Sequence, residues 1–119
     1  MCRQSTDVLA IEDRELAVAL RYIREHAGQG LTVEEVLAAV PMSRSMLERR
    51  MKRALGRTPK AEIIRIQLNR VKELLIVTNL PLATIAAKVG YEYPHYLSDL
   101  FRKKFGQTPR EFRRANKRE

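Results

Sequence analysis

The side chains with the most evident chemistry in this chain are basic, and they recur in two similar segments fifty positions apart. Leu47 to Pro59 reads LERRMKRALGRTP, and Leu97 to Pro109 reads LSDLFRKKFGQTP. Each segment carries an apolar stripe at helical spacing, a polar face rich in Lys and Arg, a glycine and a Thr-Pro pair. Because Lys and Arg attract anions, two equivalent basic helices favour a long, regular, anionic partner.

The positive charge is concentrated in the part of the chain that contains the repeat. The 119 residues carry a formal net charge of +9. Residues 1–40 hold four Arg and seven acidic residues, a balance of −3, whereas residues 41–119 hold nineteen Lys or Arg and seven acidic residues, a balance of +12. Such a field speeds the encounter with polyanions. Basic surfaces also keep proteins soluble, so the charge alone does not show that the partner is a nucleic acid.

Other side chains give little support for catalysis or metal binding. His26 and His95 are the only histidines, and Cys2 is the only cysteine. No Ser-His-Asp, metal-ligand or glycine-rich phosphate pattern accompanies them, so we expect no enzyme activity, no metal site and no cofactor. A single cysteine excludes an internal disulfide and fits a reducing compartment. No run approaches the roughly 18 apolar residues of a membrane span, so we expect a cytoplasmic protein without a membrane partner.

Helix signals follow one another along the chain, and no stretch alternates as a strand would. They predict an all-α fold of about seven helices. The helices are expected at about 13–27, from the cap Thr32 to Val40, from the cap Ser43 to Gly56, from Thr58-Pro59 to about Thr78, around Ile85 to Val89, from about Pro94 to Gly106, and from Thr108-Pro109 onward with Phe112 as an anchor.

Each half of the pattern is a short helix, a turn of three to four residues and a basic amphipathic helix, which is the helix-turn-helix plan. The short helices align at an offset of 49 and the basic helices at 50, which predicts one extra residue in the second turn. A helix of about 20 residues, roughly 30 Å long, separates the halves, and successive major grooves on one face of B-DNA lie about 34 Å apart. We predict a linker from a missing N-terminal domain at 1–12, helix-turn-helix subdomains at 13–57 and 80–119, and a linker helix at 58–79.

The outward faces of the two basic helices can be assigned roles on duplex DNA. In the helix-turn-helix plan the second helix shows its N-terminal residues to base edges in the major groove. Arg49 suits guanine and Glu48 suits a cytosine amine. The expected base contacts are Ser45, Glu48, Arg49, His95, Ser98 and Asp99. The expected phosphate contacts are Thr32, Arg44, Lys52, Arg53, Tyr93, Arg102, Lys103, Lys104 and Arg110. Any one of these side chains could instead be merely solvated.

Family signature residues occur in the second half: Ile85-Ala86, Val89-Gly90-Tyr91, Tyr96-Leu97, Phe101, Phe105-Gly106 and Thr108-Pro109. From about Leu31 to Arg113 the chain resembles the DNA-binding domain of the AraC/XylS family of bacterial transcription regulators. The resemblance implies a seven-helix domain with two helix-turn-helix subdomains and double-stranded DNA as partner. The segment SRSMLERRMK is similar to that of the xylose-operon activators. That similarity implies an activator of a sugar-catabolism operon, whose effector binds only a missing N-terminal sensor domain.

Two positions depart from the family pattern. Asp99 and Gln67 stand where many members carry a basic residue, so we expect the first subdomain to dominate specificity. Among the tyrosines, Tyr91 should pack on the core and only Tyr93 should be an exposed contact, which weakens a single-strand stacking role. RNA polymerase is an expected partner of such an activator. The alternative function is a protein-interaction module that docks its basic face on an acidic partner such as RNA polymerase. The repeat and the length of the linker helix do not require this alternative.

Overall fold

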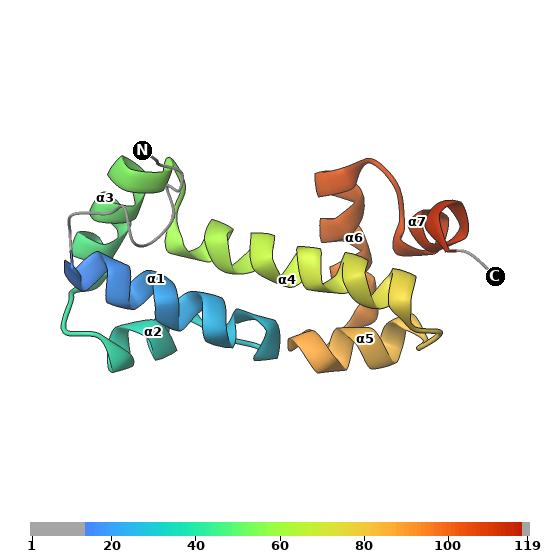
Figure 1. Cartoon of the computed structure of the whole chain (residues 1–119), viewed down its shortest axis with the longest axis horizontal. Coiled ribbons are helices and arrows are strands. Elements are labelled where there is room, and N and C mark those ends of the chain that lie inside the picture. Colours follow the sequence, from blue (N-terminus) through green and yellow to red (C-terminus); the bar gives the residue numbers. More distant parts are fainter. Residues whose placement is uncertain (1–13, 118–119) are drawn as a thin grey trace. The chain divides into compact units, whose positions relative to one another are not determined.

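The computed structural model describes residues 14–117, and within them the helices follow the predicted order (Figure 1). No strand occurs in this range, and the all-α fold of about seven helices is confirmed. The predicted linker at 1–12 lies outside the described residues. The elements are α1 (Arg14–His26), the 3-10 turn η2 (Ala27–Gln29), α2 (Val33–Ala39), α3 (Arg44–Leu55), α4 (Pro59–Val77), α5 (Leu82–Val89), α6 (Pro94–Phe105) and α7 (Pro109–Asn116).

Helices α2, α3, α4 and α7 begin at a Ser or Thr whose side chain accepts from a free backbone N–H group of the first turn. Thr32 Oγ1 accepts from the Glu35 N–H at 3.2 Å, and Glu35 Oε1 accepts from the Thr32 N–H at 2.9 Å. Ser43 Oγ accepts from the Met46 N–H at 3.2 Å and starts α3. Both predicted caps are therefore confirmed. A second capping box, between Thr108 and Glu111, starts α7 and repeats the Thr-x-x-Glu spacing seen at α2.

The described chain divides into two compact units, with the boundary inside α4 between Ile64 and Arg65. Unit 1 contains the residues up to Ala27 and Leu31–Ile64. Here α1 packs against α2 and α3, and the largest fully buried side chains come from all three helices. These side chains are Leu16, Ile23, Val36, Leu47 and Met51. The subdomain limits at 13–57, 58–79 and 80–119 stay a prediction.

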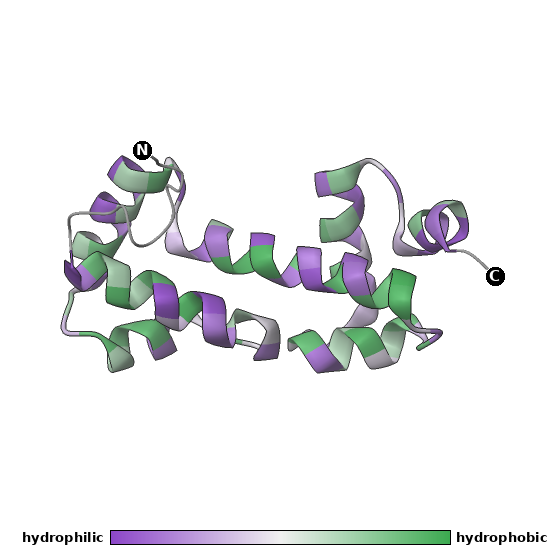
Figure 2. Ribbon diagram, viewed as in Figure 1, coloured by the Kyte–Doolittle hydropathy of each residue, from purple (hydrophilic) through white to green (hydrophobic). Residues whose placement is uncertain are grey.

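Unit 2 contains Gly28–Gly30 and the residues from Arg65 onward. Here α6 packs against α5 and α7, and α4 contributes to the same core. The largest fully buried side chains are Leu68, Leu75, Ile85, Leu97 and Phe101. Figure 2 shows hydrophobic and hydrophilic residues alternating along α3 in unit 1 and α6 in unit 2. Each basic helix thus has one apolar side for its own core and one polar side for other contacts.

The turns before α3 and α6 are equally long, contrary to the prediction of an extra residue in the second. Residues 40–43 separate α2 from α3, and residues 90–93 separate α5 from α6. The extra residue belongs to α5, whose last residue is Val89. The capping residue after it is Gly90, which has φ 95°. Val40 precedes a proline, which disfavours the helical region, and it adopts φ −124° and ψ 147°. The proline therefore ends α2 one residue earlier.

Two basic residues, Arg113 in α7 and Lys117 just after it, donate to carbonyls at the C-terminal end of α4. The guanidinium of Arg113 donates to the carbonyls of Leu75 at 3.0 Å and Thr78 at 3.1 Å. Lys117 Nζ donates to the Thr78 carbonyl at 2.7 Å and to the Ile76 carbonyl at 3.1 Å. The last carbonyls of a helix lack intrahelical donors and carry partial negative charge, so cations stabilise them. These two basic side chains consequently stabilise unit 2.

Candidate nucleic-acid interface

The basic helices α3 and α6 are each 12 residues long and are held in the same way. Leu47 and Met51 in α3, like Leu97 and Phe101 in α6, are fully buried. Both helices end at a glycine in the left-handed region, with φ 76° and 79°. Burying one side of each helix leaves the opposite side to solvent. The predicted base contacts lie there: Ser45, Glu48, Arg49, His95 and Asp99 are exposed, and Ser98 is half-buried.

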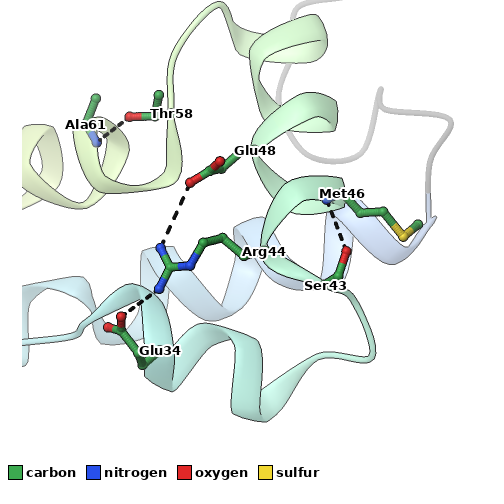
Figure 3. A network of polar contacts seen from close by, with 7 residues as sticks. All are labelled: Glu34, Ser43, Arg44, Met46, Glu48, Thr58 and Ala61. Atoms are coloured by element: carbon green, nitrogen blue, oxygen red, sulfur yellow. Dashed lines mark hydrogen bonds and ion pairs between the residues drawn. The ribbon is translucent and has the colours of Figure 1, made fainter.

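An ion-pair cluster lies at the N-terminal end of α3 (Figure 3). Arg44 Nη2 lies 2.6 Å from Glu34 Oε2 on α2, and Arg44 Nη1 lies 3.9 Å from Glu48 Oε2 one turn further along α3. A backbone hydrogen bond, followed by Arg44, holds the pKa of Glu34 below its ordinary value. Arg44 was predicted to contact phosphate. In the structure its guanidinium is paired with two carboxylates, those of Glu34 and Glu48.

The remaining predicted phosphate contacts are exposed, and six of them are basic. Lys52 and Arg53 lie in the last turn of α3, and the last turn of α6 carries three more basic residues. Thr32 and Tyr93 are the N-terminal cap positions of α2 and α6, and Arg110 lies in the first turn of α7. The six exposed basic residues are Lys52, Arg53, Arg102, Lys103, Lys104 and Arg110.

An ion pair between a partly exposed arginine and a buried glutamate fixes the corner after α3, and the sequence alone did not reveal it. Arg57 Nε donates to Glu62 Oε1, and the Glu62 side chain is only 3% exposed. Fifty residues later the equivalent positions are Gln107 and Phe112, and Phe112 is buried against Phe101 with ring centroids 5.6 Å apart. In the sequence, this difference could have been found by aligning the two repeated segments at these positions. The equivalent corners of the two units are therefore stabilised differently, by an ion pair in unit 1 and by an aromatic contact in unit 2.

The start of α6 is aromatic, and its tyrosines differ from one another in burial. Tyr93 is 58% exposed as expected, but Tyr96 is also 49% exposed, so the expectation of a single exposed tyrosine is wrong. The Tyr91 hydroxyl donates to Gln67 Oε1 at 2.7 Å. Burial, followed by the proximity of Tyr96, raises the pKa of Tyr91 to about 12. Tyr91 packs on the core as predicted.

Gln67 was interpreted as a missing basic contact, and its position corrects that interpretation. Its side chain is 6% exposed and accepts the hydrogen bond from Tyr91 across the core of unit 2. A buried polar group costs free energy unless it is hydrogen-bonded, and this pair satisfies both partners. Gln67 thus supports the turn before α6 rather than facing a ligand.

Within residues 14–117, no three His, Cys, Asp or Glu side chains gather into a group that could hold a metal ion. No helix in the described part of the chain is both long and apolar enough to cross a membrane.

The geometry of two units, each with a short helix, a four-residue turn and an exposed basic helix, is matched by a family of known domains. The family model described as "Helix-turn-helix domain" matches residues 36–115, which include α3 and α6. The chain belongs to the AraC-type helix-turn-helix family. The predicted resemblance is confirmed, and α3 and α6 occupy the positions of the family's recognition helices.

Relatives of this AraC-type domain include sugar-operon regulators. The chain is 40% identical over 114 residues to the xylose operon regulatory protein of Escherichia coli K12, covering 96% of this chain and 29% of that protein. The chain thus spans under a third of that relative, and the similarity to the xylose-operon regulators is confirmed.

Two solved structures confirm the fold. The C-terminal domain of AraT, a response regulator from Geobacillus stearothermophilus, is 34% identical with a TM-score of 0.83, and the match covers 88% of each chain. The DNA-binding domain of the global transcriptional factor AdpA, solved in complex with a target DNA, is 27% identical with a TM-score of 0.78; the match covers 85% of this chain and 91% of that domain.

Proposed function

We propose that this AraC-type domain binds duplex DNA sequence-specifically, with α3 and α6 each entering a major groove. The observation that carries the proposal is the pair of equally long recognition helices, each with a fully buried apolar side and an exposed polar side. The family match and the DNA complex of a structural relative support it. The family match does not favour the alternative of a basic module that docks on an acidic protein.

The exposed residues of α3 fit a division between bases and backbone. Arg49 presents a guanidinium that can donate twice to guanine O6 and N7, and Ser45 lies one turn earlier on the same side. Lys52 and Arg53 follow further along the helix, where phosphates are the nearer groups. We propose that Arg49 reads a base and that these two cations grip the backbone.

The length of α4 suits binding in adjacent grooves. The helix has 19 residues. At about 1.5 Å per residue it is roughly 28 Å long, close to the approximately 34 Å between successive major grooves on one face of B-DNA. We propose that one chain reads one asymmetric site of nearly two turns, with the first recognition helix dominating specificity.

The relatives suggest a role for the longer protein to which such a domain belongs. Because the chain is similar to xylose operon regulatory proteins, we propose that it serves a cytoplasmic activator of a sugar-catabolism operon. In that proposal the sugar binds a separate N-terminal domain, and RNA polymerase is the partner at the promoter. Catalysis is not part of the proposed role.

Selection of duplexes from a randomised pool, followed by binding titrations at rising salt, tests the proposal. We expect one enriched sequence that binds at least about a thousandfold more tightly than random DNA, and a steep loss of affinity with salt from counterion release. Equal affinity for the selected duplex and for random duplexes contradicts sequence-specific binding.

A further inference from the structure

The two recognition helices begin with different chemistry. At the offset of fifty residues, α3 starts with serines and an arginine, whereas α6 starts with aromatic rings. The only basic residues of α6 besides His95 lie in its last turn, so its first two turns contain no Lys or Arg. The equivalent pairs are Ser43 and Tyr93, Arg44 and Pro94, Ser45 and His95, Met46 and Tyr96, and Arg49 and Asp99. Because the start of α6 has no arginine, it cannot make the contact between Arg and guanine.

The aromatic side chains at the start of α6 are exposed yet held in place. Tyr93 and Tyr96 are 58% and 49% exposed. The Tyr96 ring lies against Tyr91 with centroids 6.0 Å apart, and Tyr91 is anchored to the buried Gln67 by the 2.7 Å hydrogen bond. Tyr93 lies beside His95 with ring centroids 5.9 Å apart. Contacts of this kind restrict the rotamers of exposed rings before a ligand arrives, which lowers the entropy cost of binding.

The major groove offers one apolar group to such rings, the C5-methyl group of thymine. The neighbouring Asp99 is compatible with an A·T pair. Its carboxylate can only accept hydrogen bonds, and the adenine N6 amine donates in the same groove. Guanine presents acceptors at O6 and N7 and has nothing to offer a carboxylate. Cytosine N4 also donates in this groove, so the carboxylate is compatible with either base pair. The methyl group, which only thymine carries, is what lets aromatic rings favour A·T over G·C pairs.

We propose that the start of α6 selects thymine by packing Tyr96, flanked by Tyr93, against its 5-methyl group. This inference rests on the proposed function and specifies what the second recognition helix reads. It makes Tyr96 a specificity-determining residue. The second unit can then distinguish bases by itself, even though Asp99 stands where the first unit has Arg49. The first unit then reads through charge and hydrogen bonds, and the second through apolar contact.

Replacing thymine by deoxyuridine removes that methyl group and nothing else. The probe is the best duplex selected from a randomised pool by the whole chain, with each thymine replaced singly by deoxyuridine. We expect one or two positions where uracil weakens binding about fourfold, the effect of losing one buried methyl group. Arg49→Ala should keep this sensitivity. Tyr96→Phe should keep it too, because the ring remains, whereas Tyr96→Ala should bind the thymine and uracil duplexes equally.

The outcomes separate this inference from the proposed function. A selected duplex whose uracil versions all bind like the parent overturns thymine selection alone, and so does a Tyr96→Ala variant that still discriminates; in either case the rings serve another surface. If no duplex is preferred over random DNA, the proposed function itself fails and this inference fails with it. The uracil series on the unmodified chain needs no variant to fold, so it decides even if Tyr96→Ala proves unstable.

Discussion

Arg44 Nη2 lies 2.6 Å from Glu34 Oε2, which joins the first residue of the recognition helix α3 to the preceding helix α2. Glu48 Oε2 lies 3.9 Å from the same guanidinium on its other side. The pair is exposed, and exposed ion pairs contribute little to stability because solvent screens them. A phosphate can therefore compete for Arg44, and the two carboxylates oppose that competition on any duplex.

Removing the carboxylate of Glu34 should release Arg44 to the DNA backbone. We expect Glu34→Gln to tighten binding to random duplexes and to steepen the salt dependence by about one phosphate contact. Fluorescence titrations over a series of salt concentrations measure both. Glu73→Gln is the matched control, because Glu73 also lies 2.6 Å from an arginine, Arg70, but on α4. A steeper slope in Glu34→Gln that persists when Arg44 is also changed to Gln would assign the effect to general charge.

The base and phosphate roles can be separated by two substitutions. Arg49→Ala should cost about 1–3 kcal/mol at the selected site and relax the preference at one base position. Lys103→Ala should weaken all duplexes alike and lower the salt slope by about one. Repeating the duplex selection with each variant measures these effects. If Arg49→Ala weakened every sequence by the same factor, its assignment to a base would be wrong.

The corner after α3 should depend on the ion pair of Arg57 and the buried Glu62. Arg57→Gln leaves the nearly buried Glu62 carboxylate without this partner, and we expect a loss of about 1–3 kcal/mol of unfolding free energy, less than for a fully buried pair because Arg57 is partly exposed. Adding Glu62→Phe should recover most of the loss, since unit 2 has the combination Gln107 and Phe112. Urea unfolding measures both variants, and a double variant less stable than Arg57→Gln alone contradicts the equivalence of the corners.

Tyr91 should make stability depend on pH in the alkaline range. Its pKa is raised from 10.0 to about 12, so between these values the unfolded chain loses the proton while the folded chain keeps it. Stability from this group is complete below about pH 10 and is lost as pH rises toward 12. The measurement is the difference between the wild type and Tyr91→Phe in urea unfolding at each pH, because contributions common to both proteins cancel in that difference. Tyr93→Phe, at an exposed ring, is the control. A wild-type and Tyr91→Phe difference that does not change with pH contradicts the shift.

Local signals in the sequence were enough for the helices, but contacts between distant residues were not. Thr32, Ser43 and Gly56 act on backbone groups within a few residues, so their caps could be predicted. The hydrogen bond between Gln67 and Tyr91 joins residues 24 positions apart, and it required knowledge of how α4 packs against the turn before α6. That packing turned Gln67 from an expected surface position into part of the core.

The charged clusters show the same limit for the candidate site. Helical spacing was enough to expect the basic residues of α3 and α6 on the exposed side of each helix, because burial of Leu47 and Leu97 fixes the opposite side. Spacing could not show that Arg44 is held by Glu34, since that pair depends on how α2 and α3 cross. The roles of the exposed residues on DNA stay predictions, which the substitutions above test.

Scrambling one half of the selected duplex at a time tests the central claim most directly. The claim is that two recognition helices read two parts of one DNA site. At physiological salt we expect the half read by Arg49 to cost more affinity when scrambled than the other half, and each to cost at least about tenfold, since several base pairs at about 1–3 kcal/mol each are lost. If one half can be scrambled without any loss of affinity, the claim that both helices read sequence is contradicted. If scrambling both halves leaves the affinity unchanged, sequence reading by this chain is contradicted altogether.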